Sequence, residues 1–522
     1  MREYKNSFLV HALLLSVIAV SASFLWQGDK LFNLWDEGFL WYGVQRVMLG
    51  EVPIRDFMSY DPGRYYWSGL LMSLFKDNGI MALRMSVAVF QMMGLFVGLL
   101  LVGQALGERS KENVVYFVLS SMVFVLWMYP RHKLFDCSLS IFLIGILALL
   151  AGHPTRKRYF FAGMGVGLIA FFGRNHGVYG VVGSLGVILW LNIKKQEGVG
   201  FVQGGLTWAL GVIAGYVPPM LLLVLIAPEF FSAFLEGLKT YFHTESTNIN
   251  LPIPWLWRVD IASVPIHTAI HQVLVGLFFI AEAAFAIVAL LWAIFNKYRG
   301  RKIPSVLVAA SFLSLPYMHF SYSRADIGHL AQGVFPLLVG TLSFFATQSK
   351  WVKWPLVLIL CGASLGVMLV MQPGWICRAE NKQCIRVDVA GEPLYVYPHV
   401  ARNISLLQEL NRKYTPNDQN FLVVPFWPGA YALLERKCPM WEIYSLRPRS
   451  DAFQDKEIER IKAASPQFVV VLDFPLDGRD DFRFKNLRPR IYQYILSSFD
   501  PLNVSLDPHL NIFRAPDVNR GQ

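Results

Sequence analysis

Two adjacent acidic residues, Asp36 and Glu37, are the strongest candidates for chemistry in this chain of 522 residues. They lie in the stretch Asn33-Leu-Trp-Asp-Glu-Gly-Phe-Leu-Trp41, where aromatic residues flank both acids. A carboxylate walled by aromatic rings at a membrane surface is well placed to act as a general base. Capping of a helix N-terminus explains acidic residues here equally well. The residues alone leave both interpretations open.

Basic residues form three further clusters, each at the end of an apolar segment. The clusters contain Arg131, His132 and Lys133; Arg174 and His176; and Arg324, Asp326 and His329. Arginine and lysine bind phosphate by charge-assisted hydrogen bonds, so clusters that converge on one membrane face would suit an anionic lipid headgroup. For Arg324 and Asp326 there is an alternative to phosphate binding, namely an ion pair that only makes a helix end more soluble. His329 is one turn into an apolar segment, where ionisable groups are costly and commonly functional.

The composition predicts that these residues are carried by a polytopic membrane protein. Hydrophobic residues make up 54% of the chain and charged residues 16%, whereas about a quarter of an ordinary soluble domain is charged. Apolar runs of about 18 residues or more recur along the chain, as membrane-spanning helices require. We expect spans at 8–26, 80–104, 113–129, 134–152, 158–173, 177–193, 203–227, 271–295, 303–320, 327–347 and 354–372.

The distribution of basic residues predicts the orientation of these spans. Loops that alternate along the chain carry Arg109 and Lys111; Arg156, Lys157 and Arg158; Lys194 and Lys195; Lys297, Arg299, Arg301 and Lys302; and Lys350 and Lys353. Because basic loops favour the cytoplasm, the N-terminus is expected there, and an odd number of spans places the tail outside. The net charge of +11 then reflects cytoplasmic loops and does not indicate a nucleic-acid partner. The expected location is the plasma (inner) membrane.

Two regions are expected to lie outside the bundle. The transmembrane domain, 1–372, includes a long first outer loop at 27–79, with two amphipathic helices expected flat on the membrane. One helix runs from Asp36 to Gly50, and the other begins at Pro62 with Asp61 as N-cap. The tail, 373–522, contains apolar strands at 421–426 and 467–473 and an amphipathic helix between them at 453–464, which predicts a small extracytoplasmic α/β domain. The fold class is therefore mainly α.

Other patterns limit the possible functions. Cys377 and Cys384 frame a short polar stretch, and a disulfide or two free thiols are equally open. Gly163 and Gly167 lie inside an apolar span and are interpreted as a helix-packing contact. No Walker loop or His-Glu-x-x-His motif is present, so a soluble-type nucleotide or metal enzyme is disfavoured.

At this point the chain resembles the GT-C superfamily of membrane glycosyltransferases, in the branch of protein O-mannosyltransferases and lipid A aminoarabinose transferases. The resemblance covers about 1–372. It rests on Trp35-Asp36-Glu37-Gly38 after the first span, on Tyr60-Asp-Pro-Gly-Arg-Tyr-Tyr66, and on Arg324-Ala-Asp-Ile-Gly-His329.

The resemblance implies transfer of a sugar from a polyprenyl-phosphate donor to a glycan, lipid or protein acceptor at the outer face, usually with inversion. It implies Asp36 as the general base, with Glu37 second. The residues expected to bind the donor phosphate are Arg64, Lys133, Arg174, His176, Arg324 and His329. Neither a cofactor nor a metal ion is expected. The partners are the lipid-linked donor, the acceptor and membrane lipids.

Two other functions remain open from the sequence. A transporter or flippase would place charge near the membrane midplane, and Glu282, inside the predicted span 271–295, favours that alternative. A lipid-linked polymer ligase or polymerase would concentrate function in a late outer loop, for which 228–270 is the candidate.

Overall fold

Packing divides the chain into two units. The computed structural model describes residues 2–106, 111–193, 198–243, 249–381, 383–502 and 508–516. The first unit, here the helical unit, comprises Met1–Gly28, Arg84–Phe231 and Leu235–Ile376; the second, here the mixed unit, comprises Asp29–Leu83, Ser232–Phe234 and Cys377–Gln522. The first outer loop therefore packs with the tail, although it precedes most of the bundle in the sequence.

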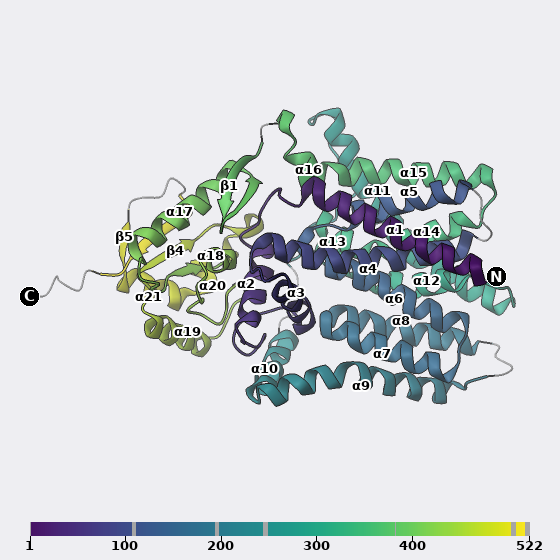
Figure 1. The fold of residues 1–522 in the computed structure, drawn as a ribbon, viewed down its shortest axis with the longest axis horizontal. Coiled ribbons are helices and arrows are strands. Elements are labelled where there is room, and N and C mark those ends of the chain that lie inside the picture. Colours follow the sequence, from purple (N-terminus) through teal and green to yellow (C-terminus); the bar gives the residue numbers. More distant parts are fainter. Residues whose placement is uncertain are drawn as a thin grey trace, which may run out of the picture. The chain divides into compact units, whose positions relative to one another are not determined.

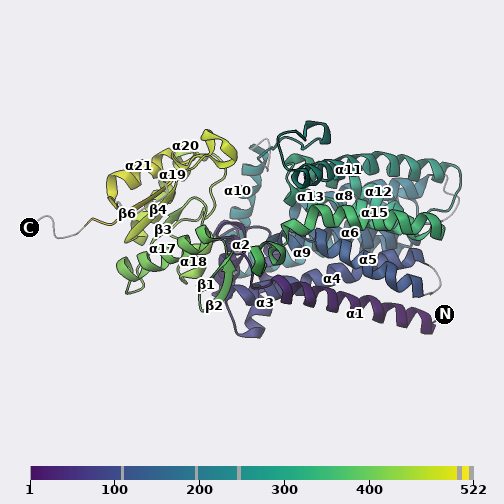
Figure 2. The ribbon, with the colours of Figure 1, turned by 90° about the horizontal axis from the view of Figure 1, so that it is seen from above.

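The helical unit is a bundle of long helices that run alongside one another (Figures 1 and 2). Its helices are α1 (Arg2–Gln27), α4 (Ile80–Leu106), α5 (Lys111–Trp127), α6 (Leu134–Gly152), α7 (Arg156–Phe172), α8 (Arg174–Asn192), α9 (Phe201–Ile226), α11 (Ile266–Tyr298), α12 (Ser305–Ser323), α13 (Ile327–Gly333), α14 (Phe335–Ala346), α15 (Lys350–Met368) and α16 (Pro373–Ile376). A further helix, α10, spans Glu229–His243. A helix thus covers each predicted span, and the last but one is broken between α13 and α14.

Not all of these helices qualify as membrane spans. Within the described residues, six are long and apolar enough to cross a membrane, and the pair α13–α14, bent by 52°, would make a seventh. This identifies a multi-pass membrane protein, but the predicted count of eleven spans is not confirmed. The other helices are too short or too polar to count by length and composition; α7, for example, has 17 residues. Arg109, Lys194 and Lys195, which support the predicted orientation, lie outside the described residues.

Helices α7 and α9 lie side by side in Figure 1, and glycines allow their close approach. A Cβ atom at Gly163 would lie 1.9 Å from the carbonyl oxygen of Trp208, and one at Gly167 would lie 2.3 Å from that of Val212. From the other side, a Cβ at Gly211 would lie 2.1 Å from a carbonyl oxygen of α7. The predicted small-residue contact is confirmed, because no larger side chain fits between these two backbones.

The tail folds as predicted around a short parallel strand pair. Strands β3 (Leu422–Val424) and β4 (Phe468–Leu472) pair in parallel, with helix α19 (Asp451–Ala464) between them in the sequence. The four-stranded sheet has the order β3-β4-β6-β5. All residues of β3 and β4 are buried, which explains why the two strands read as uninterrupted apolar runs.

The remaining elements of the tail surround this sheet. They are α17 (Pro398–Tyr414), α18 (Pro428–Leu433), α20 (Phe484–Leu487), α21 (Pro489–Ser498), β5 (Asp500–Leu502) and β6 (Leu510–Arg514), with a separate hairpin of β1 (Ile385–Val389) and β2 (Glu392–Val396).

Both predicted helices of the first loop are present, as α2 (Asp36–Met48) and α3 (Pro62–Phe75). Residues Glu37–Gln45 of α2 are all buried, so protein covers this helix where we expected a membrane surface. A Cβ at Gly38 would lie 2.5 Å from Gly429 of α18, and the Gly429 amide donates to the Leu34 carbonyl at 2.9 Å. An amphipathic pattern shows that an apolar face is covered, but it does not show whether lipid or protein covers it.

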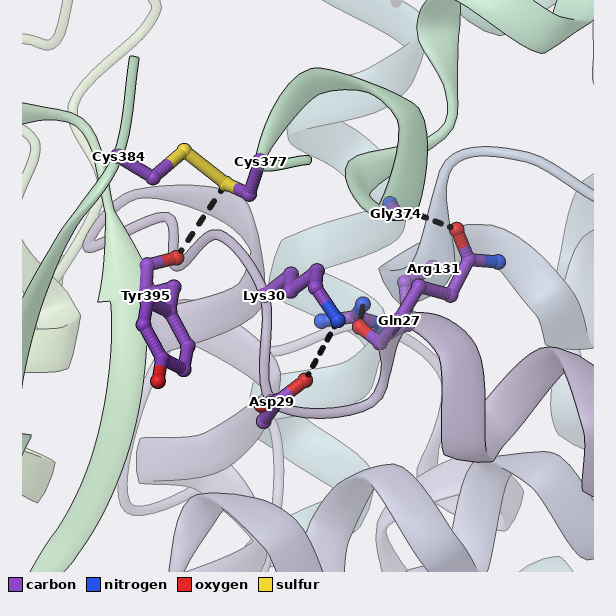
Figure 3. The surroundings of a disulfide bond; sticks show 8 residues. All are labelled: Gln27, Asp29, Lys30, Arg131, Gly374, Cys377, Cys384 and Tyr395. Carbon is purple, nitrogen blue, oxygen red and sulfur yellow. Dashed lines mark hydrogen bonds and ion pairs between the residues drawn. A yellow bond between two sulfur atoms is a disulfide. The ribbon is translucent and has the colours of Figure 1, made fainter. Parts of the chain in front are cut away.

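A disulfide joins Cys377 to Cys384 next to the start of the first loop (Figure 3). The sulfur of Cys377 lies 3.6 Å from the carbonyl oxygen of Tyr395 in β2. The same carbonyl accepts a hydrogen bond from the Leu31 amide at 2.7 Å, and the Tyr395 amide donates to the Asp29 carbonyl at 2.9 Å. Of the two interpretations left open by the sequence, the structure has the disulfide, which persists in oxidising compartments.

Candidate functional site

Asp36 is the first residue of α2, and its side chain is half-buried. The N-cap position is occupied by Trp35, and no side-chain capping hydrogen bond is made there. The Tyr444 hydroxyl donates to Oδ1 of Asp36 at 3.4 Å. The helix dipole favours an anion at this place, and Asp36 lies in the first turn of the helix without being its N-cap residue.

Glu37 differs from its neighbour in exposure, because only 6% of its surface is accessible. It belongs to the run of buried residues that packs α2 into the mixed unit. A buried carboxylate is less suited to contact a substrate hydroxyl than a half-buried one. Asp36 therefore remains the first candidate for the base.

Aromatic rings surround Asp36, as the flanking residues predict. Trp35 stacks on Phe426 with 4.9 Å between ring centroids and an interplanar angle of 12°, and it also contacts Phe474 at 5.3 Å. Tyr444 meets the edges of both Phe39 and Phe426 at 5.7 Å. The first loop and the tail each contribute to this aromatic cluster, so the sequence near Asp36 reveals only half of it.

Arg64 in α3 does not extend to the surface, because it is only 3% exposed. Its guanidinium lies over the Tyr60 ring at 5.0 Å, and Tyr60 in turn contacts Phe39 at 4.7 Å. Arg64 is thus linked to the aromatic cluster by ring contacts. Asp61 occupies the N-cap of α3 as predicted, but its side chain makes no capping hydrogen bond.

The expected spans 158–173 and 177–193 meet at Arg174 and His176 without an intervening loop. Only Gly173 separates α7 from α8, and both residues belong to the first turn of α8. The His176 ring is buried: Nε2 lies 3.0 Å from Oδ1 of Asp136, and Nδ1 lies 2.6 Å from the Tyr317 hydroxyl. Asp136 and Tyr317 satisfy both ring nitrogens, so His176 has the contacts of a structural residue.

The contact of Asp136 with His176 also connects the segments that carry two phosphate-binding candidates, Lys133 and Arg174. Lys133 is the last residue of the 3₁₀ helix η1 (Arg131–Lys133), three positions before Asp136. Arg174 precedes His176 by two positions. The contact between Asp136 and His176 therefore joins the segment that bears Lys133 to the segment that bears Arg174. Sequence reasoning missed Asp136, although an acid in the first turn of an apolar helix was a signal for it.

A small cavity of about 50 Å³ lies at the ends of several helices of the helical unit. Arg84 and Arg131 line it. Arg84 donates to the Gly28 carbonyl at 2.7 Å, and Arg131 donates to the Gln27 carbonyl at 2.6 Å. Both carbonyls belong to the C-terminal end of α1, where cations are favourable. These arginines therefore have a structural explanation, and Arg84 was not identified from the sequence.

Arg324 and His329 meet through Asp326. The Arg324 side chain bonds to Oδ2 of Asp326 at 2.8 Å, and Oδ1 accepts from the amide of His329 at 2.8 Å and lies 2.9 Å from its Nδ1. Asp326 is the N-cap of α13. Burial opposes ionisation of Asp326, but its bonds with His329 and the charge of Arg324 outweigh burial and lower the carboxyl pKa. The ion pair considered from the sequence is present and also includes His329.

Glu282 is buried in α11, with its Oε1 accepting from the Ser321 hydroxyl at 2.9 Å and its Oε2 without a hydrogen bond to the described residues. No group of three or more His, Cys, Asp and Glu residues in the described ranges could hold a metal ion.

The candidates thus fall into two sets. The mixed unit carries Asp36, Glu37 and Arg64, and the helical unit carries Lys133, Arg174, His176, Arg324 and His329.

Comparison with solved structures identifies the fold. ArnT from Cupriavidus metallidurans matches in its apo state with a TM-score of 0.58 and 13% sequence identity, covering 97% of this chain and 98% of ArnT. ArnT bound to undecaprenyl phosphate matches with a TM-score of 0.56 and 13% identity, covering 97% and 99%. The chain has the ArnT fold. The resemblance predicted from the sequence is confirmed at the level of the fold.

A second solved structure has a lower similarity to this chain. The oligosaccharyltransferase of Archaeoglobus fulgidus in its apo form matches with a TM-score of 0.45 and 11% identity, covering 95% of this chain and 72% of that one. No protein-family model matches the sequence, and no curated protein matches it.

Proposed function

We propose that this protein is a glycosyltransferase that moves a sugar from a polyprenyl-phosphate donor to an acceptor hydroxyl at the outer membrane face, with inversion. The observation that carries the proposal is Asp36, half-buried among aromatic rings at the start of α2. The ArnT fold supports it, since the match extends over nearly all of both chains and one matched structure is bound to undecaprenyl phosphate.

The proposed reaction is a single displacement. Asp36 takes the proton from the acceptor hydroxyl, and the acceptor oxygen forms a bond to the anomeric carbon of the sugar. The bond between that carbon and the phosphate oxygen breaks, and the polyprenyl phosphate leaves with the bonding electrons. Attack from the face opposite to the leaving group inverts the anomeric centre.

Negative charge grows on the leaving phosphate, so cations there stabilise the transition state. We assign this role first to Lys133 and Arg174, because they flank the contact of Asp136 with His176. Arg324 and His329 are secondary, since Asp326 already engages both. Arg64 is the candidate from the mixed unit. His176 is assigned a supporting role, because both of its ring nitrogens have protein partners.

The proposed reaction needs no cofactor, and the lipid-linked donor is a substrate. The acceptor is a glycan, lipid or protein, and the proposed location is the plasma membrane with the N-terminus in the cytoplasm. A transporter or flippase is not favoured, because the fold is that of ArnT and because Glu282 is engaged by Ser321 inside the bundle.

A sugar-transfer assay on the purified full chain in nanodiscs tests the proposal. A panel of radiolabelled polyprenyl-phosphate sugars is offered with cell-envelope extract as the acceptor source, and released polyprenyl phosphate is measured with and without a chelator. Wild type is expected to release it and Asp36→Asn is not. Transport of the donor without cleavage, stopped by Glu282→Gln and not by Asp36→Asn, would contradict the proposal.

A further inference from the structure

The tail domain supplies the hydroxyl group that reaches Asp36. Tyr444 lies between β3 and α19, more than four hundred residues after Asp36 in the sequence, and its hydroxyl donates to Oδ1 at 3.4 Å. Its ring is held by edge contacts with Phe39 of α2 and Phe426 of the tail, both at 5.7 Å between centroids. The contact therefore links the two parts of the mixed unit at the proposed base.

A buried charge network fixes the segment that carries Tyr444. Glu442 is 2% exposed and forms ion pairs with Arg449 and with the fully buried Arg488. It also accepts from the Ser445 hydroxyl at 3.0 Å. Breaking a buried pair of this kind is costly, so the residues on either side of Tyr444 are held in one position.

Backbone contacts strengthen the same segment. Glu457 of α19 accepts from the amides of Trp441 and Glu442 at 2.8 and 3.3 Å, and the Ser445 amide donates to the Pro425 carbonyl at 3.2 Å. A buried ion pair is weak evidence for a more stable fold, but it can favour one conformation of the surrounding chain over others. The arrangement specified here is the one that presents Tyr444 to α2.

The helix that carries Asp36 is fixed to the same domain. Gly38 lies against Gly429 so closely that a Cβ would be 2.5 Å from its backbone. The amide of Cys438 donates to the Tyr42 hydroxyl at 3.0 Å, and the Gln45 side chain donates to the Ala432 carbonyl at 3.4 Å. Asp36 and Tyr444 are thus both positioned by the tail domain.

We propose that Tyr444 is a positioning residue for Asp36, through which the tail domain takes part in sugar transfer. This inference rests on the proposed function. By holding one carboxylate oxygen, the phenol fixes the orientation in which Asp36 meets the acceptor hydroxyl, and such pre-organisation accelerates transfer. The distance of 3.4 Å is long for this pair, and catalytic hydrogen bonds commonly shorten when substrate binds.

Tyr444→Phe tests the inference, because it keeps the ring and removes the hydroxyl. The matched control is Tyr492→Phe, in the same domain, where the ring contacts Phe484. We expect Tyr444→Phe to lower kcat about tenfold with the KM for the donor unchanged. Tyr492→Phe is expected to match wild type.

A double-mutant cycle separates positioning from a general effect on folding. On the Asp36→Asn background, Tyr444→Phe should change the slow residual rate less than twofold, since the carboxylate base that it positions is already gone. Undecaprenyl phosphate binding and the melting temperature should stay at wild-type values. An unchanged kcat in Tyr444→Phe would overturn the inference, as would a full tenfold loss on the Asp36→Asn background. Absence of sugar transfer by wild type would instead refute the proposed function.

Discussion

Asp36 and Asp136 occupy the same local position in two regions of this protein, yet their surroundings differ. Each is an acidic residue in the first turn of a helix, α2 in the mixed unit and α6 in the helical unit. Asp36 is half-buried and receives a long hydrogen bond from Tyr444. Asp136 is buried and lies 3.0 Å from His176, whose other nitrogen contacts Tyr317. One carboxylate keeps part of its surface exposed, and the other is enclosed by its protein partners.

Tertiary packing therefore decides how far an acid at a helix start is enclosed by protein. In an apolar bundle, an ionisable side chain is tolerated when protein partners satisfy it. Where packing leaves an acid half-buried, as at Asp36, the side chain keeps part of its surface exposed. The role of each carboxylate can therefore be tested by removing one charge at a time.

The largest expected effect comes from Asp36→Asn. Loss of the base should lower the rate of sugar transfer by roughly 10²- to 10⁴-fold, while the melting temperature in detergent stays within about 2 °C of wild type because the side chain is half-buried. Asp136→Asn is the matched comparison and should show the opposite pattern, with lower stability and a smaller loss of rate. Equal losses of rate in the two variants would contradict the distinction drawn here.

Removal of a phosphate-binding charge is expected to have the next largest effect. Lys133→Gln and Arg174→Gln should each weaken binding of undecaprenyl phosphate by roughly 10- to 100-fold, because each removes a charge-assisted hydrogen bond. Binding can be followed by native mass spectrometry in detergent. Lys302→Gln, an exposed residue between α11 and α12, is the control and should bind as wild type does. Wild-type affinity in both test variants would remove them from the phosphate site.

His176→Ala tests the buried region directly. It leaves Asp136 and Tyr317 buried without the imidazole between them, which should lower the free energy of unfolding by about 2 kcal/mol. Tyr317→Phe removes one hydroxyl and should cost about half as much. Thermal unfolding in detergent, followed by tryptophan fluorescence, measures both. A His176→Ala variant with wild-type stability and a large loss of lipid affinity would mean that His176 binds the phosphate after all.

Much of the architecture could be predicted from the sequence, because it depends on local patterns. Apolar length placed a helix over every predicted span, and the glycine spacing at Gly163 and Gly167 predicted a close helix contact, which the structure shows between α7 and α9. The alternation of apolar strands with a helix predicted the β3–α19–β4 unit. These features need only hydropathy and spacing within about 50 residues.

The candidate site could be predicted only in part, because its contacts join distant residues. Asp36 was identified by its own neighbours, but nothing near it indicates Tyr444 or Phe426. His176 was interpreted as a phosphate ligand, since its partners Asp136 and Tyr317 lie 40 and 141 positions away. A polar residue in an apolar segment can be recognised as unusual, but its partner depends on which helices pack together.

The smallest expected effect concerns the ion pairs of Glu51 in the mixed unit, where the Glu51 side chain is 15% exposed and the Lys437 side chain is 57% exposed. Burial raises the pKa of Glu51, but its bonds to Arg46 and Lys437 outweigh burial and hold it below 4.5. A lowered carboxyl pKa contributes stability above pH 4.5 that disappears as the pH falls through the lowered value. Glu51→Gln should therefore cost less than about 1 kcal/mol at pH 7, and the difference from wild type should vanish in acid. A difference that persists unchanged at pH 3 would show that packing, and not charge, makes Glu51 matter.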